Sequence, residues 1–140
     1  MPRTLLCLAS AAMVLAACGN KTLDNSAIRI AAGELRSQAV QIKLIAATIP
    51  TDTTTQFYRS AQLSFLADKI RETREELSSG SPKGGLEQQL SRAQILGRQV
   101  NDELEGLVSS GENPAKAREI AAALEKLIEQ FVALEASLRK

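Results

Sequence analysis

Residues 113–138 read NPAKAREIAAALEKLIEQFVALEASL, and this stretch decides the fold. Asn113 can cap a helix, and Pro114 suits the first helical position, where a missing N–H costs nothing. Apolar residues then return every three or four positions without a break, as in a helix with one buried stripe. That stripe consists of Ala117, Ile120, Leu124, Leu127, Phe131, Leu134 and Leu138.

Two other stretches show the same periodicity. One covers about residues 25–48, begins after Asp24 as an N-cap and stops at Pro50. The other covers about residues 86–109, with Gly97 on its seam as the expected mark of a close helix crossing. The first carries large aliphatic residues beside a row of alanines that lets a partner helix approach: Ile28, Leu35, Ile42 and Ile49 with Ala32, Ala39 and Ala46. The seam of the other is Leu86, Leu90, Ala93, Gly97, Val100, Leu104 and Leu107.

A fourth helical stretch covers about residues 54–79. Thr53 and Gln56 fit a capping box at its start, and Gly80 with the loop at residues 81–85 ends it. We expect its core face to consist of Phe57, Ala61, Leu63, Leu66, Ala67, Ile70 and Leu77.

Four amphipathic stretches of similar length predict an all-α fold. The joints between them span about four to six residues, which makes neighbouring helices antiparallel. An up-down-up-down four-helix bundle buries all four stripes within one chain. The alternative is a pair of long helical hairpins that bury their stripes only in an oligomer.

The composition is globular but lacks the residues that most catalytic and metal sites need. Of 140 residues, 44% are hydrophobic and 24% charged, and the net charge is +1. The chain has no His, and every Met and Cys lies among the first 18 residues. Zinc and copper sites and His-based nucleophiles are therefore excluded, and Tyr58 is the one remaining residue of a haem-ligating type. Without a basic excess, nucleic acid is not expected as a partner. We expect no enzyme activity, no metal and no free cofactor.

The amino-terminal residues have the form of an export signal. One positive charge precedes residues 4–17, which are uncharged and mostly apolar but too short for a membrane span of about 20 residues. The run ends in Leu15-Ala16-Ala17-Cys18, which resembles the lipobox of bacterial lipoproteins. The resemblance implies cleavage between Ala17 and Cys18 and attachment of lipid to Cys18. Several acyl chains would make the anchor effectively permanent.

The lipobox implies a division of the chain into three parts. Residues 1–17 are expected to be the signal peptide, 18–24 an acylated tether and 25–140 the helical bundle domain. Residue 19, directly after the lipobox cysteine, is Gly and not Asp. By resemblance to the sorting rules of enterobacterial lipoproteins, this favours export to the outer membrane. That resemblance implies an outer-membrane anchor with the bundle facing the periplasm.

An anchored bundle has a membrane-proximal end and a distal end. Lys21, Lys83, Arg139 and Lys140 are expected at the proximal end, where basic side chains attract anionic head groups. The alternative is that these are ordinary basic residues of helix ends and loops.

The distal end is expected to carry a partner-binding site. Its candidate residues are Thr51, Asp52, Thr54, Thr55 and Tyr58, close to the turn at residues 110–113. The alternative is that the threonines only cap the start of a helix.

These features favour a binding or scaffolding lipoprotein that holds a periplasmic protein partner. Secretin pilotins are similar in size, lipobox and helical content. Two alternatives remain. The ending Arg139-Lys140 resembles the tail of the murein lipoprotein, which would make the chain a link between membrane and peptidoglycan, and a bundle could instead carry an apolar ligand. Homo-oligomers fit each of these hypotheses.

Overall fold

A computed structural model describes residues 21–139 of the chain. Within that range the chain forms four long helices: α1 (Asn25–Thr48), α2 (Gln56–Ser79), α3 (Glu87–Ser109) and α4 (Pro114–Ser137). Two very short strands, β1 (Thr22–Leu23) and β2 (Ser81–Pro82), lie outside the helices. The helix predictions for the first and last stretches are confirmed almost to the residue.

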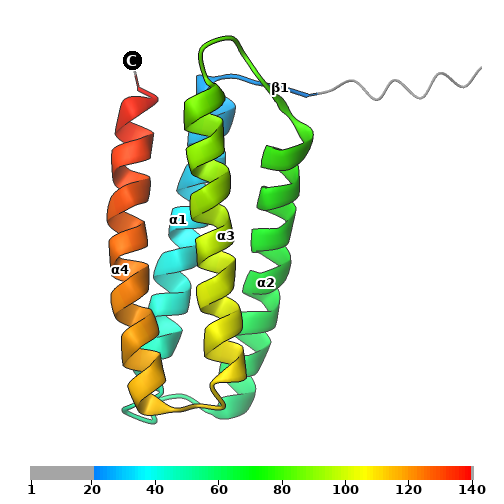
Figure 1. Cartoon of the computed structure of the whole chain (residues 1–140). Helices are drawn as coiled ribbons and strands as arrows, with labels where there is room; N and C mark the ends of the chain where they lie inside the picture. Colours follow the sequence, from blue (N-terminus) through cyan, green and yellow to red (C-terminus); the bar gives the residue numbers. More distant parts are fainter. Residues whose placement is uncertain (1–20, 140) are drawn as a thin grey trace, which may run out of the picture.

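The helices form an up-down-up-down bundle (Figure 1). Each helix packs against its neighbours in sequence, α4 closes the bundle against α1, and α1 also contacts α3 across the centre. The most extensive of these contacts joins α1 and α4. The predicted bundle within one chain is therefore confirmed, and the extended hairpins are not formed.

The helix caps follow from local sequence. The Asp24 side chain accepts a hydrogen bond from the Ala27 N–H at 2.8 Å, and Asn113 accepts from two N–H groups of the first turn of α4. The start of α2 differs from the prediction, because Thr55 rather than Thr53 is the N-cap and accepts from the Tyr58 N–H at 3.2 Å.

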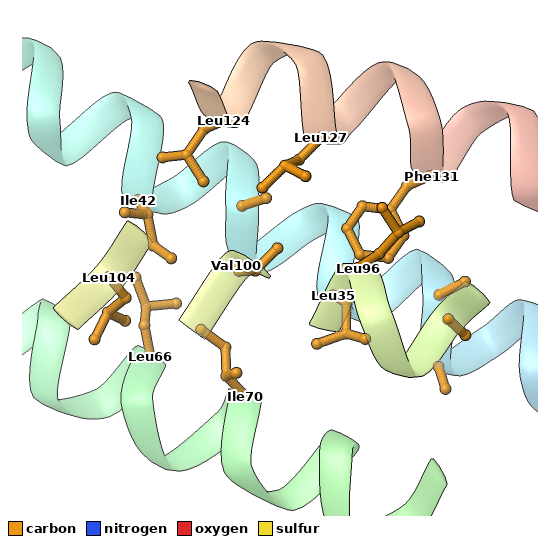
Figure 2. Packing of buried hydrophobic residues seen from close by; sticks show 14 of the residues in the cluster. Leu35, Ile42, Leu66, Ile70, Leu96, Val100, Leu104, Leu124, Leu127 and Phe131 are labelled. Carbon is orange, nitrogen blue, oxygen red and sulfur yellow. The ribbon is translucent and has the colours of Figure 1, made fainter. Parts of the chain in front are cut away.

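The core runs the length of the bundle and receives side chains from all four helices. Figure 2 shows residues of each helix directed toward a common interior. The predicted stripes of α1, α3 and α4 are buried, with Ile49 and Leu86 partly buried at their edges. The largest fully buried side chains include Ile28, Leu35, Ile42, Leu66, Ile70, Leu96, Ile120, Leu124, Phe131 and Leu134.

Small residues set the closest approaches in the bundle. Ala32, Ala39 and Ala46 are buried on α1, the helix that packs most extensively against α4. A methyl group added at Gly97 would lie 3.1 Å from Cδ1 of Leu35, closer than most real carbon contacts. The close crossing expected at Gly97 is therefore present.

The expected tether is partly built into the fold. β1 pairs in parallel with β2, and the Lys83 N–H donates to the Leu23 carbonyl at 2.8 Å. Leu23 is 1% exposed and belongs to the core, so the domain begins before residue 25. The sequence reading missed this pairing because two-residue strands carry no periodicity.

Candidate functional site

The buried stripe of α2 matches the prediction at Leu63, Leu66, Ile70 and Leu77 but not at its distal end, where Phe57 and Ala61 are exposed. It follows the alternating four- and three-residue spacing of a heptad seam: Arg59, Leu63, Leu66, Ile70, Thr73 and Leu77. Phe57 lies two positions before Arg59, about 200° around the helix. Its prediction as a core residue is therefore wrong, and the Phe57 side chain is 85% exposed.

Arg59 takes the inward position that was expected for an aromatic residue. Its side chain is 5% exposed, and Nη2 lies 2.7 Å from Oε1 of Glu112 and 3.8 Å from Oδ1 of Asp52. Nη1 donates to the carbonyl and hydroxyl oxygens of Thr54. The guanidinium thus joins the loop between α1 and α2 to the loop between α3 and α4.

Both carboxylates that meet Arg59 come from left-handed turn residues. Asp52 has φ 49° and Glu112 has φ 67°, values that L residues seldom adopt. Such conformations cost about 1 kcal/mol or more each and persist where the surroundings fix them. The shared guanidinium is one such constraint, and it orders the distal end of the bundle.

The predicted distal residues are brought together, but most of their polar groups serve the local fold. The Thr51 hydroxyl lies within hydrogen-bonding distance of the carbonyls of Ala47 and Thr48, and Thr55 caps α2. Asp52 and Thr54 contact Arg59. Tyr58 is 54% exposed and is the predicted site residue that presents a large apolar surface to solvent.

The exposed apolar surface of α2 extends beyond Tyr58. We call it the aromatic face and define it by Phe57, Tyr58, Ala61 and Phe65 of α2 with Leu44 of α1. Phe65 is 55% and Leu44 61% exposed, and Ala61 is also exposed. Lys69 Nζ lies 5.9 Å from the centroid of the Phe65 ring, at the proximal border of this face. The sequence analysis assigned Phe57 to the core and Phe65 to no site.

A groove of about 440 Å³ lies on the other flank of α2, toward α3. Its apolar lining includes Leu63, Ala67, Leu107 and Val108, and small side chains of α2 such as Ser64 keep it open. Val108 at its border is 58% exposed. The volume lies within the range of about 300–1,000 Å³ that is usual for small ligands and protruding side chains.

The distal halves of the two hairpins differ sharply in charge. Residues 44–67, the α1–α2 tip, contain two charged residues, Asp52 and the buried Arg59. Residues 98–121, the α3–α4 tip, have the same length and contain eight. Surfaces that bind proteins are depleted in charge and enriched in aromatic residues. The α1–α2 tip has this character and the α3–α4 tip does not.

The predicted basic residues of the proximal end have separate environments. Lys21 forms an ion pair with Glu76, whereas Lys83 and Arg139 are exposed. Arg139 borders a shallow groove with Asn25, Ser26 and Arg29. All lie at the bundle end where the first described residues enter (Figure 1). The remaining predicted residues, Ala17, Cys18 and Lys140, lie outside the described part of the chain.

Among residues 21–139, no group of three or more Cys, Asp or Glu side chains is arranged to hold a metal ion. No helix in this range is long and apolar enough to cross a membrane. Comparison with protein-family models, with curated proteins and with solved structures found no match to this chain.

Proposed function

We propose that this chain is a bacterial lipoprotein, acylated at Cys18 after cleavage at Ala17, whose bundle presents the aromatic face to a protein partner. The observation that carries the proposal is the position of this uncharged, aromatic surface at the end of the bundle opposite Lys21. A lipid three residues before Lys21 would hold the opposite end at the membrane. The aromatic face would then project into the periplasm, with the outer membrane as the proposed site of anchoring.

Exposure of the aromatic face supports binding rather than folding. Phe57 and Phe65 contribute little to the core, and an exposed aromatic ring gains free energy only when something covers it. Taking roughly 200 Å² for a whole aromatic side chain, the exposed fractions of Phe57, Tyr58 and Phe65 amount to about 400 Å². The largest apolar patch on a soluble domain commonly has about this size and is often functional.

Mass spectrometry of the protein purified from a bacterial envelope tests the anchor. The expected mature chain begins at Cys18 and carries a diacylglyceryl group, and Cys18→Ser should lose this mass. An unmodified cysteine, or a chain that retains residues 1–17, would overturn the anchoring part of the proposal.

Photocrosslinking in intact cells tests the binding surface. A photoreactive phenylalanine analogue at position 65 should give a discrete protein adduct, which Phe57→Lys in the same chain removes. The matched control carries the analogue at Ile95, another partly exposed apolar position away from the aromatic face. Equal adducts from both positions, or none from position 65, would remove the aromatic face as a binding site.

A further inference from the structure

The two flanks of distal α2 carry different side chains. Tyr58 and Phe65 lie on the flank toward α1, where they border grooves shared with that helix, and Phe57 points outward between the two flanks. The groove of about 440 Å³ opens on the flank toward α3. Between the flanks lie the small exposed side chains of Ala61 and Ser64. One surface therefore carries both exposed rings and a mainly apolar groove of a size that accepts them, with Glu105 and Glu112 in its wall.

This arrangement is self-complementary under one particular symmetry. A twofold axis parallel to the bundle and just outside α2 places the aromatic flank of one copy against the groove flank of the other, and does so twice. Such a contact is isologous and closes as a dimer. A twofold axis perpendicular to α2 would instead oppose the two aromatic flanks and leave both grooves empty.

Charge permits this contact at the α1–α2 tip. Asp52 and Arg59 are the charged residues of the tip, and they cancel. The groove wall also carries Glu105 and Glu112, and the uncharged aromatic face of a second copy brings no like charge to them. The α3–α4 tip, which contributes Leu107 and Val108 to the groove, has five acidic and three basic residues, so two copies that faced each other through this tip alone would repel.

The charged half of α2 limits where two copies touch. From Asp68 onward, the exposed side of α2 carries Asp68, Arg71, Glu72 and Glu75. Parallel copies therefore approach most closely near Ala61 and diverge toward the proximal end, as helices do when they cross at an angle. Small residues at the crossing allow the helices to come close.

We propose that the aromatic face binds a second copy of this chain, with the two α2 helices parallel and crossing near Ala61. The inference rests on the proposed function, because it names the partner of that same surface. A stable interface needs about 800 Å² from each copy. About half of this comes from the three aromatic rings, and the remainder is available from Leu44, Val108 and the neutral side chains of the tip. Both amino-terminal ends then point the same way, which fits anchors in one membrane.

Crosslinking of the full chain in its host membrane tests the pairing. Ala61→Cys treated with a short bismaleimide should give a product of twice the chain mass. Ala122→Cys is the matched control, because it is an exposed alanine on the distal half of α4. A yield at Ala61→Cys no higher than at Ala122→Cys would overturn the proposal.

Two further variants test the fit of ring into groove. Val108 lies on the α3 side of the groove and does not belong to the aromatic face of its own chain. Val108→Lys should nevertheless reduce the yield of the Ala61→Cys dimer at least fivefold. Val132→Lys, at a similarly exposed valine of α4, should leave it unchanged. If Val108→Lys has no effect, the groove does not receive the second copy and the proposal fails.

Spin labels at Glu75→Cys measure the orientation. Parallel helices that cross near Ala61 keep the two labelled positions within about 20 Å of each other, whereas antiparallel helices separate them by about 40 Å. The longer distance would overturn the proposed pairing. An Ala61→Cys adduct with a different protein mass would also overturn it, while leaving the binding role of the aromatic face intact.

Discussion

The α1–α2 tip and the α3–α4 tip perform the same structural task with different surfaces. Each ends a helical hairpin at the distal end of the bundle, and each supplies a left-handed acidic residue to Arg59. The α3–α4 tip is covered with charge, as a solvated hairpin usually is. The α1–α2 tip exposes three aromatic rings instead. Because folding makes equal demands on both, folding alone does not account for the uncharged surface of one tip, which supports the proposed binding role.

Arg59 joins the two tips, and of the predicted changes its removal should lower the free energy of unfolding most. Arg59→Leu deletes the guanidinium and leaves the Glu112 carboxylate without its partner. Loss of one member of a buried pair costs about 3–5 kcal/mol, and the 33% exposure of Glu112 reduces this to about 2–3 kcal/mol. Urea unfolding followed by circular dichroism measures the loss.

The matched control lies within the α3–α4 tip. Lys116→Ala breaks an exposed pair with Glu119 and should leave the free energy of unfolding close to that of the wild type. Adding Glu112→Gln to Arg59→Leu should recover part of the loss. If Arg59→Leu is as stable as the wild type, the two tips are not held together by this residue.

Two glycines of α3 should respond differently to alanine. At Gly106, in the α3–α4 tip, a methyl group would lie 3.5 Å from Cδ1 of Ile120, an ordinary contact. Gly106→Ala should therefore raise the free energy of unfolding by about 0.5–1 kcal/mol through helix propensity. Gly97→Ala should raise the free energy of unfolding less, or lower it, because its methyl group would lie 3.1 Å from Cδ1 of Leu35 and 3.3 Å from Cγ of Arg74. Equal rises in the melting temperature of the two variants would contradict the close crossing at Gly97.

The smallest expected effect is pH-dependent and belongs to the α3–α4 tip. Burial raises the pKa of Glu103 above its ordinary value, against the opposing charge of Lys116. A carboxyl with a raised pKa keeps its proton in the folded state after the unfolded chain has lost it. Its stability contribution is therefore lost as pH rises from the unfolded pKa through the folded one.

Glu103→Gln removes this ionisation. At pH 7 the variant should be more stable than the wild type by less than about 0.5 kcal/mol, since the site is only partly shielded from solvent. Near pH 3.5, below the unfolded pKa, the difference should vanish. Melting temperatures at both pH values test this, and a variant that is less stable at pH 7 would refute the stated cause.

Sequence patterns predicted α1, α3 and α4 well because apolar periodicity and caps act locally. Asp24, Asn113 and Pro114 mark helix starts through their own chemistry, and the stripe ending at Leu138 needed no partner to be recognised. The Gly97 crossing also followed from a glycine on an otherwise apolar seam.

The buried residues at the distal end of α2 could not be obtained in the same way. Burial of Arg59 depends on Glu112, which lies 53 residues away, so no local pattern favours an arginine over Phe57 in the core. The aromatic face was missed for the same reason, since an exposed ring is recognised only once the buried stripe is known. Tyr58 was predicted as a binding residue because it lies beside a Thr-rich turn at the distal end.

The pairing of β1 with β2 determines how the molecule would bear tension at its amino-terminal end. The Ser81 N–H donates to the Lys21 carbonyl at 2.9 Å, and any side chain at Gly80 would overlap Leu23. A pull on Lys21 is therefore transmitted to the connection between α2 and α3 as well as to the first turn of α1. The force therefore acts on both helical hairpins at once, so α1 does not unfold one turn at a time from its amino-terminal end. A chain held by a single lipid would withstand drag on its distal end in this way.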